Sequence, residues 1–139
     1  MKTEKTRQIL QNWCDSWAKD DIDAVMNNLS ENIVFYAPQN EYNKAIPYLG
    51  VKVGRQAVIE TFKIRAKTTQ LLNYEILEFI VEENKACIIS RTKEICKSTQ
   101  AIFELEDAQF IILDEEGKIS RWSFYFDPNP EIAAFKANN

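Results

Sequence analysis

Histidine is missing from this chain of 139 residues, and its absence removes several kinds of chemistry at once. No catalytic system that uses an imidazole base can form, and no histidine-ligated zinc or iron site can exist. Any proton transfer must use aspartate, glutamate, lysine, tyrosine or cysteine side chains.

Cysteine is scarce, and long apolar runs are lacking. The odd number of cysteines and their lack of metal-ligand spacing predict free thiols in a reducing compartment; they are Cys14, Cys87 and Cys96. The first residues contain no apolar core of a secretion signal, and no apolar run approaches the roughly 20 residues that a membrane-spanning helix needs. We therefore expect a cytoplasmic protein with no membrane partner, no metal and no cofactor.

Positive charge is limited too. The chain has a net charge of −4 and a pI of about 5.0. A nucleic-acid-binding protein needs a basic face, so we expect no nucleic-acid partner. The length and the hydrophobic content of 45% suit one domain with one core, and we expect residues 1–139 to form it.

Helical spacing dominates the first half of the chain. A helix is predicted over residues 3–19 by the apolar residues Ile9, Leu10, Trp13, Cys14 and Trp17. A second helix is expected within residues 20–30, capped by Asp20 or Asp21. A strand at 33–36 and a long loop at 38–53 lead to a third helix at 54–67.

The second half contains four β-rich runs, at 71–83, 85–97, 101–113 and 118–127, and then a short helix at 130–136. Helices followed by a strand meander predict an α+β fold, a cone-shaped, curved antiparallel sheet with three helices on its concave side. A cavity at the wide end of such a cone is the expected ligand site.

Three stretches carry a family resemblance. They are "AKDDIDAVMNNLSENIVFYAP", "PYLGVKVGRQAVIETF" and "DEEGKISRWSFYFD", and their order and spacing cover nearly the whole chain. Together they resemble the nuclear transport factor 2-like superfamily, in its SnoaL-like and ketosteroid isomerase-like branch. This fold hosts isomerases, hydrolases, cyclases, dehydratases and plain binding proteins, so the resemblance implies the fold more than the chemistry.

The catalytic sets of these relatives are not kept. The tyrosine, the aspartate base and the second acid of the ketosteroid isomerases fall on Trp13, Ala37 and Gln109. Steroid isomerisation by that machinery is therefore not expected. The histidine of the SnoaL-type polyketide cyclases cannot exist here.

Limonene epoxide hydrolase resembles the chain through "GKI", Trp122 and "YFD". Its arginine falls on Arg91, but its two aspartates fall on Lys93 and Phe124. Epoxide hydrolysis by that route therefore lacks its base.

Aromatic and polar residues of the expected strands are the site candidates. Arg91 and Asp107 form the candidate catalytic pair, because a turn near Ser98 would place them nearly opposite each other among apolar neighbours. The same pair could instead be a salt bridge that closes the pocket wall. The candidate ligand-binding residues are Trp13, Trp17, Phe35, Tyr48, Phe62, Gln109, Trp122 and Phe124, and the rings among them could equally fill the core.

Three functions remain open. The first is binding of a small hydrophobic molecule in an aromatic-lined cavity. The second is an isomerase, cyclase or dehydratase acting on a hydrophobic carbonyl or cyclic substrate through Asp107 and Arg91. The third is a protein-interaction module.

A roomy cavity with a polar pair would favour the enzyme, and a cavity filled by its own side chains would favour the interaction module. The resemblance also implies a homodimer that forms through the open face of the sheet. That face is expected to carry one of two largely apolar sets of residues, which a partner would cover: Leu72, Ile76 and Ile80, or Ile88, Ser90 and Cys96.

Overall fold

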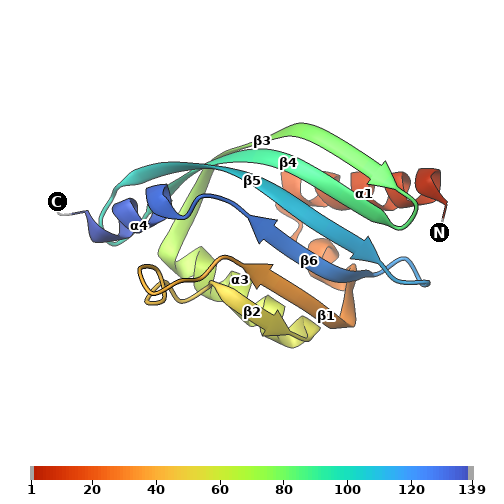
Figure 1. Cartoon of the computed structure of the whole chain (residues 1–139), viewed down its shortest axis with the longest axis horizontal. Coiled ribbons are helices and arrows are strands. Elements are labelled where there is room, and N and C mark those ends of the chain that lie inside the picture. The colour runs from red at the N-terminus through yellow and green to blue at the C-terminus, as the bar shows by residue number, and fades with distance from the viewer. Residues whose placement is uncertain (1, 138–139) are drawn as a thin grey trace.

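The computed structural model describes residues 2–137, in which three helices and two strands precede a run of four strands and a last helix (Figure 1). The elements are α1 (Thr3–Ala18), α2 (Ile22–Asn27), β1 (Leu29–Ala37), β2 (Gly50–Val53), α3 (Arg55–Thr68), β3 (Thr69–Glu82), β4 (Lys85–Cys96), β5 (Ile102–Leu113), β6 (Ile119–Tyr125) and α4 (Asn129–Lys136). The predicted α+β class is confirmed. Strand β2 lies at the end of the segment that was predicted to be a loop.

The six strands form one curved sheet in the order β2-β1-β6-β5-β4-β3. Neighbouring strands are antiparallel except β1 and β6, which pair in parallel. The sequence predicted an antiparallel meander, and this one parallel pair joins the first strand to the last. Helices α1, α2 and α3 lie behind the sheet in Figure 1 and cover one of its faces, which we call the inner face.

Local sequence explains how the helices begin. The Asp21 carboxylate caps α2 by accepting the backbone N–H of Ala24 at 3.2 Å. Gly54, just before α3, has a φ of 94°, a conformation that a glycine adopts without strain. Its N–H donates to the carbonyl of Ile33 at 2.8 Å, which ties the start of α3 to β1.

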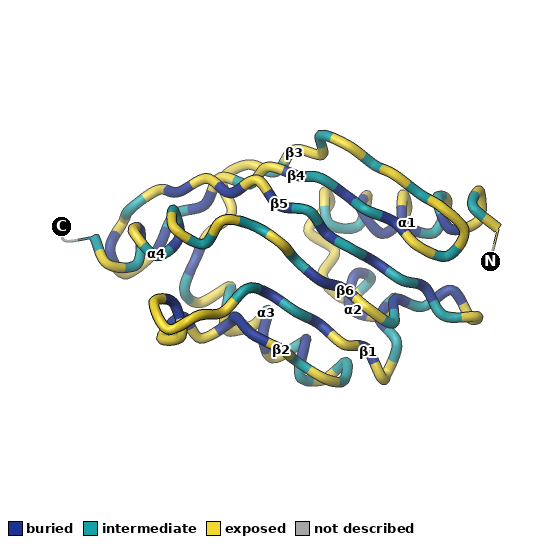
Figure 2. The backbone as a smooth tube through the Cα atoms, in the orientation of Figure 1, coloured by how far each residue is buried: buried dark blue, intermediate teal, exposed yellow. Residues whose placement is uncertain are grey.

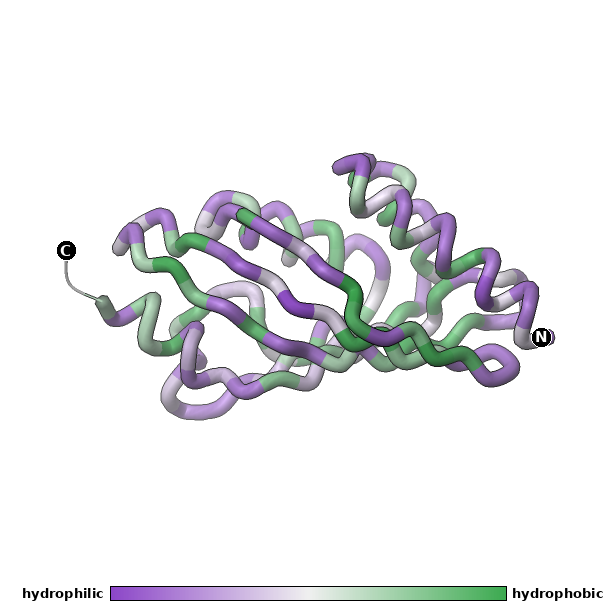
Figure 3. Tube along the Cα trace, turned by 90° about the horizontal axis from the view of Figure 1, so that it is seen from above, coloured by the Kyte–Doolittle hydropathy of each residue, from purple (hydrophilic) through white to green (hydrophobic). Residues whose placement is uncertain are grey.

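Burial alternates along the strands, as expected when one face of a sheet meets a core. On β5 every second residue is buried, from Phe103 to Leu113, and the residues between are more exposed (Figure 2). Figure 3 shows hydrophobic and hydrophilic residues alternating along the strands in the same way. The core between helices and sheet includes Leu10, Ile33, Ile88, Ile111 and Trp122.

Neither of the two sets that the sequence left open for the uncovered face lies there as a whole. Ile88, Ser90 and Cys96 are fully buried. Leu72, Ile76 and Ile80 are 38–56% exposed. Of these three, Ile80 pairs with Cys87 and lies on the uncovered face, whereas Ile76 pairs with the inward-facing Ser90. Among the described residues, no helix combines the length and apolarity needed to cross a membrane.

Candidate active site in the aromatic cavity

A cavity of about 1150 Å³ lies between the inner face of the sheet and the helices. One wall is aromatic and is built by Trp17, Phe35, Phe62, Trp122, Phe124 and Phe126. Leu72, which is 44% exposed, also lines the cavity, so the cavity opens to solvent at that side. The volume is large enough for a molecule of several rings.

Trp122 on β6 is the centre of the aromatic wall. Its ring stacks on Phe62 with centroids 5.1 Å apart and an interplanar angle of 6°. Phe35 and Phe124 approach the same indole at 5.4 and 5.3 Å. Trp122 is only 1% exposed, so these rings pack against one another as a core cluster while they also form the cavity wall.

Seven of the eight predicted ligand-binding residues line this cavity: Trp17, Phe35, Tyr48, Phe62, Gln109, Trp122 and Phe124. Trp13 does not. It packs behind the wall, edge-on to Trp122 with centroids 5.0 Å apart. Its indole N–H donates to the carbonyl of Val25 at 3.2 Å, so the placement of Trp13 at the ligand is corrected to a core role.

Arg91 also lies elsewhere than predicted. Its side chain is 48% exposed on the outer face, 3.4 Å from Glu106 and 4.0 Å from Glu75. The residue opposite Asp107 is Ser90, and Arg91 pairs with Glu106. The prediction of an Arg91–Asp107 pair is therefore wrong, because a shift of one residue in register moves a side chain to the other face of the sheet.

Asp107 itself is buried on the inner face and lines the cavity. One carboxylate oxygen, Oδ1, accepts the Ser90 hydroxyl at 2.5 Å and the Gln109 amide at 3.4 Å. Burial raises the pKa of Asp107 to about 6, although the two hydrogen bonds act in the opposite direction. The carboxyl can thus gain or lose a proton near neutral pH.

Gln109 connects Asp107 to the aromatic wall. The Trp122 indole N–H donates to Gln109 Oε1 at 3.0 Å, which fixes the orientation of the amide. The amide nitrogen then donates to the Ser90 hydroxyl at 3.2 Å and to the Tyr74 hydroxyl at 3.4 Å. Burial raises the pKa of Tyr74 to about 12, so its hydroxyl stays protonated.

A second polar group lies further along β4. Arg65 on α3 donates to the buried carboxylate of Glu94 at 2.5 Å, and its guanidinium lies over the Tyr48 ring at 4.8 Å. The Tyr48 hydroxyl donates to Glu131 on α4 at 2.6 Å. Burial raises the pKa of Glu131. The hydrogen bond between Tyr48 and Glu131 joins the loop before β2 to the C-terminal helix α4.

Ser90, Tyr74, Arg65 and Glu94 were not among the predicted site residues. Ser90 and Glu94 alternate with Ile88 on the inner face of β4, but apolar residues occur in both alternating sets of this strand, so the sequence did not mark these two as inward. No sequence signal marks Arg65 either. Within residues 2–137, no group of three or more cysteine, aspartate or glutamate side chains is arranged to hold a metal ion.

Comparisons with known proteins agree with this architecture. The model of the SnoaL-like domain family matches residues 10–122. A search of curated proteins found no match.

Solved structures with the same fold include NTF2-like proteins of Burkholderia xenovorans LB400 and Burkholderia thailandensis E264. The first has a TM-score of 0.81 at 18% identity and covers 96% of this chain and 98% of its own. The second has a TM-score of 0.83 at 16% identity, covering 99% and 100%.

A candidate polyketide cyclase of Xanthomonas campestris pv. campestris is also similar. Its TM-score is 0.73 at 14% identity, and the match covers 95% of this chain and 97% of that one. Likeness at such low identity extends to the fold alone.

Proposed function

The chain belongs to the SnoaL-like domain family, and on that premise we propose that it is an enzyme that moves a proton on a small hydrophobic molecule held in the aromatic cavity. The substrate class is a carbonyl or cyclic compound, and the reaction class is isomerisation, cyclisation or dehydration. Each of these reactions can begin with removal of a proton from carbon next to a carbonyl group.

The position of Asp107 carries this proposal. Its carboxyl is buried, lines the cavity and has a pKa of about 6. A base whose pKa lies near the working pH is deprotonated often enough to accept a proton and basic enough to remove one. A carboxylate shielded from water in an apolar cavity is the arrangement expected of such a base.

The neighbours of Asp107 suit a base rather than a salt bridge. Ser90 and Gln109 both bond to Oδ1, and no described residue donates to the other oxygen, Oδ2. Oδ2 is therefore the atom assigned to the substrate proton. Trp122 acts through Gln109 as a positioning residue, since its N–H determines which end of the amide faces Asp107.

A binding protein without chemistry is the second candidate. It is favoured by the replacement of the isomerase-type residues with Trp13, Ala37 and Gln109. The interaction module has less support, because its own side chains leave a cavity of about 1150 Å³ unfilled.

Exchange of carbon-bound hydrogen tests the enzyme without knowledge of the natural substrate. 2-Tetralone is small, hydrophobic and enolisable, and its C1 hydrogens can be followed by NMR in heavy water. We expect the native protein to speed exchange, and Asp107→Asn to lower that acceleration by about 100-fold because amides are poor bases. Glu106→Gln, an adjacent carboxylate on the outer face, is the matched control and should exchange at the native rate. Binding of 2-tetralone without faster exchange would instead favour the binding protein.

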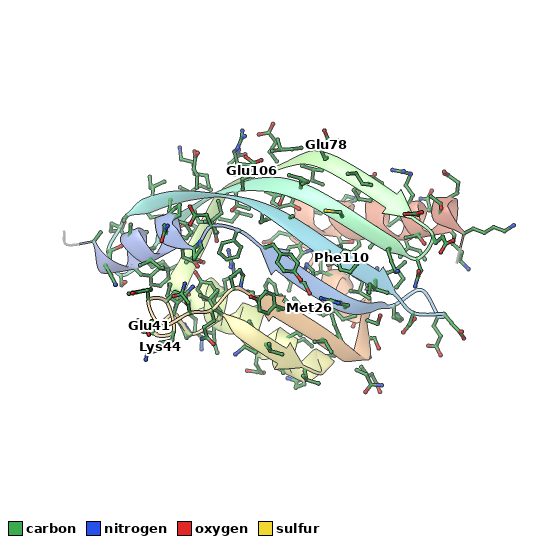
Figure 4. All side chains as sticks on the ribbon, in the orientation of Figure 1. Met26, Glu41, Lys44, Glu78, Glu106 and Phe110 are labelled. Carbon is green, nitrogen blue, oxygen red and sulfur yellow. The ribbon has the colours of Figure 1, made fainter. Side chains whose placement is uncertain are left out.

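We also propose that a second copy of the chain covers the outer face of the sheet. Glu106 and Phe110 of β5 project from this face (Figure 4). It carries apolar side chains, including Val34, Ile80, Ile89, Phe110 and Tyr125. Charges of both signs are interleaved with them, so the face can meet its own copy across a two-fold axis without clustering one sign.

A further inference from the structure

Arg65 brings a guanidinium to the wall of the cavity. It lies on α3 and lines the cavity, and its side chain is 31% exposed. Glu94 holds one of its nitrogens, Nη2, and the flat face of the guanidinium rests over the Tyr48 ring. Tyr48 is held in turn by Glu131. The guanidinium is thus fixed on two sides before any ligand arrives.

Several donors of this guanidinium are not used by the protein. Arginine carries five N–H groups in a planar fork. Within residues 2–137, the hydrogen bonds of the Arg65 side chain are limited to the one from Nη2 to Glu94. The remaining N–H groups are available to an oxygen of a molecule in the cavity.

The carboxyl groups around Arg65 determine which kind of oxygen fits. Glu94 is 1% exposed and already balances the positive charge of Arg65. Asp107 lines the same cavity, and Glu131 lies on the other side of Tyr48. An added carboxylate would meet Arg65 with its charge compensated and would be repelled by these neighbours, whereas a neutral carbonyl oxygen would meet only unused donors.

We propose that Arg65 is the polar anchor of the cavity, that it binds a neutral ketone or ester oxygen of the ligand, and that Glu94 makes the site discriminate against carboxylates. This inference rests on the proposed function in that the ligand occupies the aromatic cavity.

Two probes of the same shape test this selectivity. 2-Acetylnaphthalene carries a neutral ketone and 2-naphthoate carries a carboxylate, and both can be titrated by calorimetry at about pH 8, where the acid is ionised. We expect the native protein to bind the ketone more tightly by about ten-fold or more. Glu94→Gln keeps an oxygen for Arg65 but removes the negative charge, so the order should reverse in favour of 2-naphthoate. Glu106→Gln, whose arginine partner Arg91 lies on the outer face, should leave the order unchanged.

A double variant guards against poor folding of Glu94→Gln. Arg65→Gln combined with Glu94→Gln removes both charges together and leaves two amides that can pair. This variant should bind 2-acetylnaphthalene no better than 2-ethylnaphthalene, which lacks the oxygen. The native protein should prefer the ketone over this hydrocarbon.

The possible failures separate the two proposals. Equal binding of ketone and carboxylate by the native protein, or an unchanged order in Glu94→Gln, would overturn the role of Arg65 and leave the proposed enzyme standing. If none of the naphthalene probes binds and 2-tetralone exchange stays at the buffer rate, both proposals fail together.

Discussion

Polar residues on the two faces of strands β4 and β5 have opposite environments. Those on the inner face are buried and those on the outer face are exposed, although they alternate along the same two strands. On the inner face Ser90, Asp107 and Gln109 are buried and form one hydrogen-bonded set. On the outer face Arg91 and Glu106 are 48% and 59% exposed, and their closest N–O distance is 3.4 Å. In the inner set, burial raises the pKa of Asp107 to about 6, whereas solvent screens the charges of the outer pair.

The difference is one of environment rather than of residue type. A carboxyl in contact with water is solvated in either protonation state, and an exposed ion pair contributes little to stability. A carboxyl enclosed by apolar residues loses that solvation, which raises its pKa and lowers the stability of the folded chain when it is ionised. Asp107 is therefore expected to cost stability, and Glu106 is not.

The largest effect is expected on the outer face, if a second copy covers it. Ile89 lies in the middle of β4 with its side chain on this face. Ile89→Glu would place a charge inside the proposed contact and should raise the dimer dissociation constant by about 100-fold or more, as loss of a central contact does. Sedimentation velocity over a dilution series measures this constant. A native particle of 16.2 kDa at micromolar concentration would contradict the dimer.

A smaller effect is expected for Asp107→Asn, and it is a gain rather than a loss: the substitution should raise the free energy of unfolding. The pKa of Asp107 is raised from 3.8 to about 6 in the folded chain. The unfolded chain therefore binds fewer protons between these values, and native stability falls as pH rises from about 4 to about 6. Above this window the full penalty applies, at most about 3 kcal/mol, and the amide avoids it.

Urea unfolding across this range measures the difference between native and Asp107→Asn. The variant should be more stable near pH 8, and its advantage should shrink as the pH approaches about 4. A variant that is less stable than native near pH 8 would show that the carboxylate is well accommodated and that the inner face does not differ from the outer one in this respect.

The smallest effect is expected for Arg91→Gln in the single chain, measured at a dilution where the proposed dimer has dissociated. Its contacts with Glu106 and Glu75 are half-exposed. Loss of such pairs changes the free energy of unfolding by about 0.5 kcal/mol or less. Thermal unfolding against the native chain measures it. A loss several times larger at that dilution would mean that solvent does not screen these pairs.

Much of the fold could be predicted from the sequence, because its signals are local. The apolar spacing around Trp13 and the Asp21 cap belong to single helices, and the alternation along β5 belongs to a single strand. The short strand β2 was missed because its residues, Gly50–Val53, are recognised as a strand only through their pairing with β1.

The site could be predicted only in part, because register is not a local property. Cys87 and Ile89 are apolar like Ala86 and Ile88, so β4 does not reveal from sequence which of its faces is inward. The turn after β4 sets the register of β4 with β5, and this register determines which residues of β4 face inward. In that turn the N–H of Cys96 donates to the carbonyl of Ala101. Arg65 was missed for a related reason: it meets Glu94, 29 residues away, only after α3 has packed over the sheet.

The parallel pairing of β1 with β6 has a consequence for the order of assembly. Phe35 on β1 stands beside Trp122 on β6, so two neighbours in the cavity wall are separated by most of the chain. During synthesis β1 leaves the ribosome long before β6. Until β6 emerges, β1 lacks the strand that connects it to the rest of the sheet. Contacts between such distant segments slow folding, because a long loop must close before they form. The cavity wall is therefore expected to form late, after synthesis has passed the last strand.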